Sequence, residues 1–202
     1  MSRYCEQCGK TQYLCICQQS MRQSHRIKII ILQHPDEVKR PLSTAIIAKQ
    51  NLQFCDILVG EDFSLDPHLT QLLEHYKGKI GVLFPTEGSG LIDTMSSGAQ
   101  QPLDAMIIID GTWRKAYKMW QLTQTLHELP QYHLPESLKG NYRLRKAPSD
   151  NALSTVESIA ALLAIAEDNQ QASQQLHNVF DQMIERQMAR IPDEVKARNY
   201  RN

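Results

Sequence analysis

The stretch AMIIIDGTWRKAYKMW, from Ala105 to Trp120, contains both hydrophobic periods on which the fold depends. Its first six residues form an apolar run that ends on Asp110, which predicts a strand buried on both faces. A turn at Gly111 leads into a helix predicted over Thr112 to Leu122, and three aromatic side chains fall on one face of that helix: Trp113, Tyr117 and Trp120. A strand followed directly by a helix is the building unit of α/β proteins.

Three more apolar runs resemble this strand: Ile27 to Leu32, Asp56 to Gly60 and Lys79 to Pro85. Strands that are apolar on both faces belong in the middle of a covered sheet. Helical candidates lie between them at Ser43 to Gln50 and Pro67 to Tyr76. This alternation predicts an α/β fold with a mostly parallel sheet flanked by helices.

The last third of the chain reads as two helices. Ser154 is a candidate N-cap with Glu157 three residues later, which is the pattern of a capping box before an apolar run. A further helix is predicted from about Ala172 to Arg190, and Pro192 ends it.

Length and composition bound the class of protein. The chain has 202 residues, enough for one domain plus a small accessory piece, with 42% hydrophobic and 22% charged residues. Its 22 basic and 22 acidic side chains cancel, so attraction to a polyanion must come from local clusters. No window approaches the ~18 apolar residues of a membrane helix, and the N-terminus lacks the apolar run of a signal peptide. We therefore expect a cytoplasmic protein without a membrane partner, and a monomer is the default oligomeric state.

Four of the five cysteines lie within the first seventeen residues: Cys5, Cys8, Cys15 and Cys17. In a reducing compartment, thiols this close in sequence predict one zinc ion held by four thiolates, with a structural role because no coordination position is left for substrate. A redox pair or surface disulfides are the alternative. Residues 1–23 then form a zinc-binding piece, and residues 24–202 form the main domain. Cys55, beside a strand, is expected to be a buried, inert thiol.

Chemistry in an open α/β sheet is expected beyond the carboxyl ends of the strands. The loop FPTEGSG, residues 84–90, follows one predicted strand and leaves its backbone open to a ligand, although most such turns are only turns. Asp110 ends another strand, where its carboxylate either serves a pocket or caps the next helix. The aromatic face of that helix suits a nucleic-acid base or an adenine ring, and ordinary core packing is the alternative.

Basic residues gather near the same loops. Arg143, Arg145 and Lys146 lie in a loop bounded by proline, and Lys39 and Arg40 precede another candidate helix. Each group suits a phosphate contact, and a solvated surface is the plain alternative. The seven histidines show no i, i+4 pair of the kind that binds a metal.

In their order along the chain these motifs resemble the DTW-domain family, whose members are tRNA-uridine aminocarboxypropyltransferases. The residues that carry the resemblance are Asp110, Thr112 and Trp113 in the form DGTW, together with the cysteine cluster, HPDEVKRPLST, FPTEGS, YRLRK and LSTVES. The resemblance runs from about Tyr4 to about Leu163. Between the cysteine pairs this chain has GKTQYLC, where the family often shows an Arg-Pro, so the shape of that loop is expected to differ.

The resemblance implies an enzyme that transfers the 3-amino-3-carboxypropyl group of S-adenosyl-L-methionine (SAM) to N3 of a tRNA uridine and releases methylthioadenosine. It also implies a fold akin to the SPOUT methyltransferases, which hold SAM near a C-terminal knot; the sequence leaves the knot open. SAM would be held by two loops: Phe84, Pro85, Thr86, Glu87, Gly88 and Ser89 in one, and Leu153, Ser154, Thr155 and Glu157 in the other.

The resemblance further implies tRNA as the partner, contacted by basic side chains: Lys39, Arg40, Arg114, Lys118, Arg143, Arg145 and Lys146. Asp110, Thr112 and Trp113 form the expected catalytic group. Asp110 would remove the N3 proton of the uridine or orient the substrate, and Trp113 would stack on the target base. Two other functions fit the same motifs: a SPOUT-like RNA methyltransferase, and a non-catalytic RNA-binding module with zinc.

Overall fold

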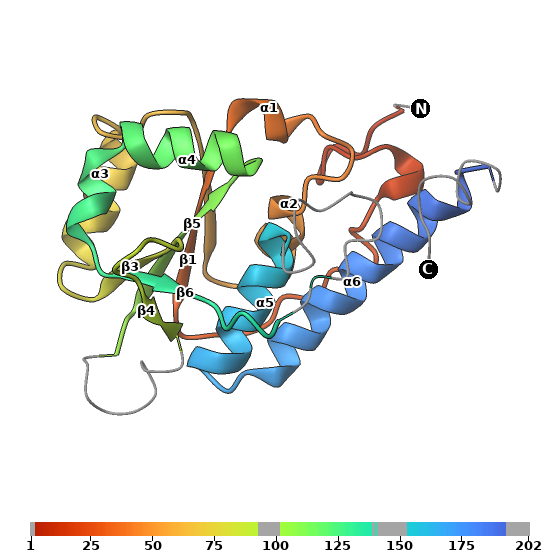
Figure 1. Cartoon of the computed structure of the whole chain (residues 1–202). Helices are drawn as coiled ribbons and strands as arrows, with labels where there is room; N and C mark the ends of the chain where they lie inside the picture. The colour runs from red at the N-terminus through yellow and green to blue at the C-terminus, as the bar shows by residue number, and fades with distance from the viewer. Residues whose placement is uncertain (1–2, 93–101, 139, 141–152, 193–202) are drawn as a thin grey trace.

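The computed structural model describes residues 3–92, 102–138, 140 and 153–192 (Figure 1). Its centre is a six-stranded sheet in the order β2-β1-β5-β3-β6-β4, in which each neighbouring pair runs parallel. The strands are β1 (Lys28–Gln33), β2 (Cys55–Val59), β3 (Ile80–Leu83), β4 (Gly90–Leu91), β5 (Ala105–Asp110) and β6 (Gln131–His133). The predicted α/β class with a parallel sheet flanked by helices is confirmed.

The middle of the sheet is formed by β1 and β5, which are buried along nearly their whole length. Their register places Gln33 beside Asp110, so the last residues of both strands lie together at the carboxyl end of the sheet. The prediction of a central position was wrong for β2, which is an edge strand with Val59 exposed. An apolar run alone does not separate a central strand from an edge strand whose outer face is partly covered.

Helices cover both faces of the sheet (Figure 1). On one face, Ile29 and Ile31 of β1 join a core with α2 (Ala45–Asn51), α5 (Thr155–Ala166) and α6 (Gln170–Ala189). On the other face, Ile30 and Leu32 join a core with α3 (Pro67–His75), α4 (Trp113–Leu122) and the 3-10 helix Gln124–Glu128. The two cores follow from the alternation of side chains along each strand.

The long elements match the sequence predictions within a few residues, whereas five short ones were missed. These are the 3-10 helix η1 (Gln12–Leu14), the helix α1 (Pro35–Val38), the 3-10 helix Gln124–Glu128 and the strands β4 and β6. None has enough residues to show a clear hydrophobic period in the sequence. Within the described residues, no helix combines the length and apolar character needed to cross a bilayer.

The N-terminal segment packs against the helical layer of α2 and α6 (Figure 1). Ile16 is buried in the same core as these helices. Arg186 of α6 donates to the Cys15 carbonyl at 2.6 Å, and Gln175 donates to the Gln19 carbonyl at 2.9 Å. The cysteine segment is therefore attached to the main body by apolar and polar contacts together.

Candidate active site and metal centre

Asp110 lies at the carboxyl end of β5, and side chains from two other elements hold its carboxylate. The Gln33 amide nitrogen at the end of β1 donates to Oδ2 at 2.7 Å, and the Thr155 hydroxyl donates to Oδ1 at 2.5 Å. Asp110 is 8% exposed and Gln33 is 4% exposed. The structure therefore joins the DGTW and LSTVES motifs, which are 45 residues apart in the chain, at one carboxylate.

Thr155 reaches Asp110 because it is the first residue of α5. The predicted capping box is confirmed: the Glu157 carboxylate accepts from the Ser154 N–H at 2.7 Å and from the Ser154 hydroxyl at 2.6 Å. Ser154 and Glu157 thus bond to each other, and Glu157 is buried. These two residues, expected to bind SAM, hold the first turn of α5 in place.

The alternative role of Asp110 as a helix cap was wrong. The N-cap of α4 is Thr112, whose hydroxyl accepts from the Lys115 N–H at 3.4 Å. Gly111 makes the turn between β5 and α4 possible, because a Cβ atom there would lie 3.1 Å from Lys115 Cβ and 3.4 Å from the Ala116 nitrogen. Asp110 therefore does not cap α4, and it lies at the carboxyl end of the sheet.

The aromatic face of α4 divides into a buried part and an exposed part. Trp120 is 5% exposed and stacks between Phe84 and His127, with ring centroids 5.0 and 4.3 Å away. Trp113 is 53% exposed and Tyr117 is 58% exposed. The Trp113 ring lies 6.3 Å from that of Phe84, which follows β3. The core-packing interpretation is thus correct for Trp120, while Trp113 presents an open indole beside the β3 loop.

The loop after β3 is held by hydrogen bonds to β6. The Thr86 hydroxyl bonds to the Gln131 side chain at 2.5 Å, and the Ser89 hydroxyl lies 2.9 Å from His133 Nδ1. Ser89 also donates to the Thr86 carbonyl at 2.8 Å, which closes the turn. Pro85, Glu87 and Gly88 are exposed on the loop. The loop has a defined shape and lies at the same carboxyl end of the sheet as Asp110, since Leu83 pairs with Ile108.

Charged residues line this edge on α1 and α4. Lys115 bonds to Asp36 at 3.0 Å and to Glu37 at 3.1 Å, and these contacts, with the Asp36 bond the largest cause, raise the pKa of Lys115. His34 Nε2 lies 2.6 Å from Glu61, which also pairs with Lys118 at 2.8 Å. This end of the sheet therefore carries both positive and negative side chains.

The basic residues expected to contact RNA differ in their pairing. Arg40 forms an ion pair with Glu37 at 3.1 Å, and Lys118 pairs with Glu61. In the described part of the chain, Lys39 and Arg114 form no ion pair, and both are exposed. Arg143, Arg145 and Lys146 lie outside the described residues, as do residues 147–152.

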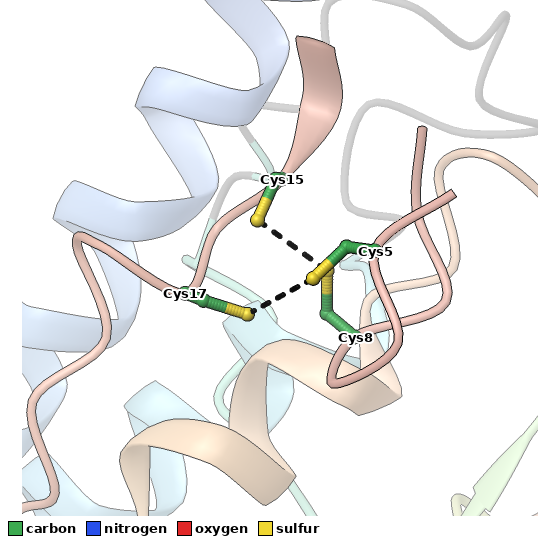
Figure 2. Close-up of side chains that lie close together, drawn as sticks. All are labelled: Cys5, Cys8, Cys15 and Cys17. Carbon is green, nitrogen blue, oxygen red and sulfur yellow. Dashed lines mark hydrogen bonds between the residues drawn. The ribbon is translucent and has the colours of Figure 1, made fainter. Parts of the chain in front are cut away.

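The four N-terminal cysteines form one cluster (Figure 2). Their sulfur atoms all lie within 4.8 Å of one another, with Cys5 and Cys17 at 3.7 Å and Cys8 and Cys15 at 3.9 Å. A tetrahedral zinc ion with bonds of about 2.3 Å separates its sulfurs by about 3.8 Å, whereas a disulfide bond is about 2.05 Å long. The cluster fits a metal ion and contains no disulfide.

The pKa values of Cys5 and Cys17 shift in opposite directions. The backbone N–H groups of Cys8 and Gln7 lower the pKa of Cys5 to about 6, while burial, followed by contact with Cys5, raises the pKa of Cys17 to about 12. Neighbouring thiolates repel each other, so four thiolates this close together need a cation between them. The predicted burial of Cys55 is confirmed, and this burial raises the pKa of its thiol to about 12.

Sequence reasoning missed Gln33, Ser43 and His133. Gln33 ends an apolar strand just as Asp110 does, so its position carried the same signal. The partner of Ser89, His133, lies on β6, which was not predicted. Ser43 accepts from the Gln33 amide at 3.1 Å, and only the folded loop brings them together.

The fold and site define an α/β protein with a parallel sheet and polar side chains gathered at its carboxyl edge, the position at which such sheets bind ligands. Sequence comparison agrees with the motifs found at that edge. The chain belongs to the DTW-domain family, whose model matches residues 2–188.

Curated relatives carry a common name. The chain is 28% identical to tRNA-uridine aminocarboxypropyltransferase 2 of Drosophila melanogaster, over 85% of this chain and 70% of that protein. It is 29% identical to the proteins of the same name from Macaca fascicularis and Mus musculus, over 82% of this chain and 57% of each of those proteins. The chain thus spans little more than half the length of the two mammalian relatives. No solved structure matches it.

Proposed function

We propose that this chain transfers the 3-amino-3-carboxypropyl group of SAM to N3 of a tRNA uridine. The observation that carries the proposal is the DTW-domain match over residues 2–188, which includes Asp110, Thr112 and Trp113. The relatives named tRNA-uridine aminocarboxypropyltransferase 2 support it, since their similarity extends over most of this chain.

The reaction is a displacement at carbon. Bound SAM supplies a sulfonium that activates the carbon: uridine N3 forms the new bond to the aminocarboxypropyl carbon, the bond between that carbon and sulfur breaks with its electrons on sulfur, and methylthioadenosine leaves. Three carbons are attached to a sulfonium, so the protein selects the product by deciding which carbon lies in line with N3.

Two loops would hold SAM beside Asp110. In this proposal residues 84–89 contact the adenosine end, and Leu153 and Thr155 at the start of α5 contact the amino-acid end. The hydrogen bond between Ser89 and His133 and the bond from the Ser154 hydroxyl to Glu157 give both loops a fixed shape before SAM binds. A preorganised pair of loops suits a reaction that depends on alignment.

Asp110 would accept the N3 proton of uridine as a general base; the alternative is that it only orients the substrate. Bonds from Gln33 and Thr155 would hold the two carboxylate oxygens in position for this role. The exposed Trp113 would stack on the uridine after it leaves the tRNA helix. Thr112 would serve by capping α4, which sets the position of Trp113.

Other parts of the proposal follow the family resemblance. They are a SPOUT-like arrangement and tRNA contacts by the seven basic residues. From the sequence itself we further propose a zinc-binding piece over residues 1–23, a cytoplasmic location and a monomer. The spacing of the four sulfurs supports zinc as the metal. Lys39 and Arg114, which are exposed, are the basic side chains best placed for phosphate.

The decisive experiment is to incubate the purified chain with SAM and unmodified tRNA and to weigh the digested nucleosides. The proposal expects a uridine heavier by one aminocarboxypropyl group, together with methylthioadenosine. A methylated nucleoside with S-adenosylhomocysteine would overturn it in favour of a methyltransferase. Salt-dependent RNA binding with no product and no heat of SAM binding would indicate an RNA-binding module instead.

A further inference from the structure

Lys10 is an unusual residue, because it is a buried lysine in the turn of the cysteine cluster. It is 5% exposed. Its ammonium group donates to the Pro41 carbonyl at 2.8 Å and to the Ser43 carbonyl at 3.0 Å. These two carbonyls flank Leu42 in the loop between α1 and α2, so one side chain fixes the path of that loop.

The loop held by Lys10 continues to the active site. The Ser43 hydroxyl accepts from Gln33 Nε2 at 3.1 Å, and the same nitrogen donates to Asp110 Oδ2 at 2.7 Å. An amide nitrogen has two hydrogens, and these two bonds use both. The orientation of the Gln33 amide, and with it the donor to Asp110, is therefore set in part by the position of Ser43.

The backbone of Lys10 is fixed by the cysteine turn. The Cys5 N–H donates to the Lys10 carbonyl at 2.7 Å, and the Gly9 N–H donates to the Cys5 carbonyl at 2.9 Å. Gly9 has a φ of 67°, which lets the chain turn between Cys8 and Lys10. A turn closed by cysteine ligands thus ends in a side chain that reaches the loop beside the active site.

We propose that Lys10 is a positioning residue for the reaction, which acts on the Asp110 carboxylate through the carbonyls of the 41–43 loop, the Ser43 hydroxyl and the Gln33 amide. The inference rests on the proposed function for the role of Asp110. It gives the cysteine segment a second task beyond folding, since the segment holds one end of a chain of hydrogen bonds whose other end is the catalytic carboxylate.

The test compares Lys10→Met with Lys49→Met. Lys49 is the control, since its ammonium also donates to a backbone carbonyl, that of Cys55 at 2.6 Å, but at the amino end of β2, where it also pairs with Asp56 at 2.9 Å. We expect Lys10→Met to lower kcat by about 10- to 100-fold through misalignment, with KM for SAM and metal content unchanged. Lys49→Met should leave kcat unchanged. Wild-type kcat in Lys10→Met would overturn the proposal.

A double-mutant cycle separates this path from a general loss of stability. In the Gln33→Leu background the connection to Asp110 is already broken, so adding Lys10→Met should change kcat by less than about twofold. Losses that multiply would overturn the proposal. Should Lys10→Met fail to fold, Ser43→Ala breaks the same connection outside the cysteine turn and should reproduce the loss of kcat.

A spectroscopic measurement makes the test independent of activity. The side-chain ¹⁵NH₂ signals of Gln33, assigned by their loss in Gln33→Leu, should shift in Lys10→Met and stay in place in Lys49→Met. Unshifted signals in Lys10→Met would contradict the connection even if transfer is observed. Shifted signals in a chain that modifies no tRNA would reject the proposed function while retaining the connection.

Discussion

Two neutral donors fix the orientation of the Asp110 carboxylate. The Gln33 amide and the Thr155 hydroxyl come from different elements and bond to different oxygens. Asp110 is thus held in one orientation, which suits a group proposed to meet a single proton on a bound base.

Asp110→Asn tests this residue directly. The substitution replaces one acceptor oxygen with an NH₂ group that faces a donor, so we expect kcat to fall by at least ~100-fold and stability to fall by about 1–3 kcal/mol. Product formation and thermal unfolding measure the two effects. Asp104→Asn is the control, because Asp104 precedes the same strand at its amino end and pairs with Lys79 at 3.2 Å. Equal activity of both variants would remove Asp110 from catalysis.

Helix α5 couples the fold to the site at the scale of a secondary-structure element. Its capping box fixes the first turn, and Thr155 in that turn bonds to Asp110. A cap that in most helices contributes only stability here also sets the position of a donor to Asp110, the proposed catalytic residue. The same helix packs on α6, whose N-cap is Asn169.

Ser154→Ala and Asn169→Ala therefore form an informative pair. Each removes a side-chain cap, so each should destabilise the protein by about 1 kcal/mol in denaturant unfolding. Asn169 accepts from the Ala172 N–H at 3.0 Å, far along the chain from Asp110. Only Ser154→Ala should lower kcat, by several-fold. A matching loss of kcat in Asn169→Ala would mean that stability alone explains both.

At the scale of the whole molecule, the cysteine segment and the main body share one core. Cys8 and Ile16 are buried with residues of α2 and α6, and Arg186 bonds across the contact. A metal ion that fixes the cysteine segment would therefore stabilise the layer of helices that covers one face of the sheet.

Metal loss should consequently affect the whole protein. Cys8→Ser should lower the metal content from one ion per chain to well below one. It should also lower Tm by about 5–10 °C, the result of losing a few kcal/mol in a chain of this size. Elemental analysis and thermal unfolding measure both. Cys55→Ala is the control and should keep the full metal content, since Cys55 lies outside the cluster. Full metal content in Cys8→Ser would contradict a four-cysteine site.

The sequence by itself determined the features that depend on near neighbours. The strand Ala105–Asp110 was predicted with its observed bounds, because six consecutive residues carry the apolar pattern. The capping box at Ser154 needs only residues three apart, and the cysteine turn needs a short spacing. Local geometry restricts such features strongly, so a short sequence pattern is enough to predict them.

Only the tertiary structure decided how the site is assembled. Gln33 and Asp110 are 77 residues apart, and Thr155 is 45 residues beyond Asp110. Their meeting depends on β1 lying beside β5 and on α5 beginning over that edge, and no period or spacing in the sequence specifies strand order. The same holds for Lys10 and Ser43, which are 33 residues apart. Chemistry could be assigned to single residues from the sequence, whereas the bonds between them follow from the packing of distant segments.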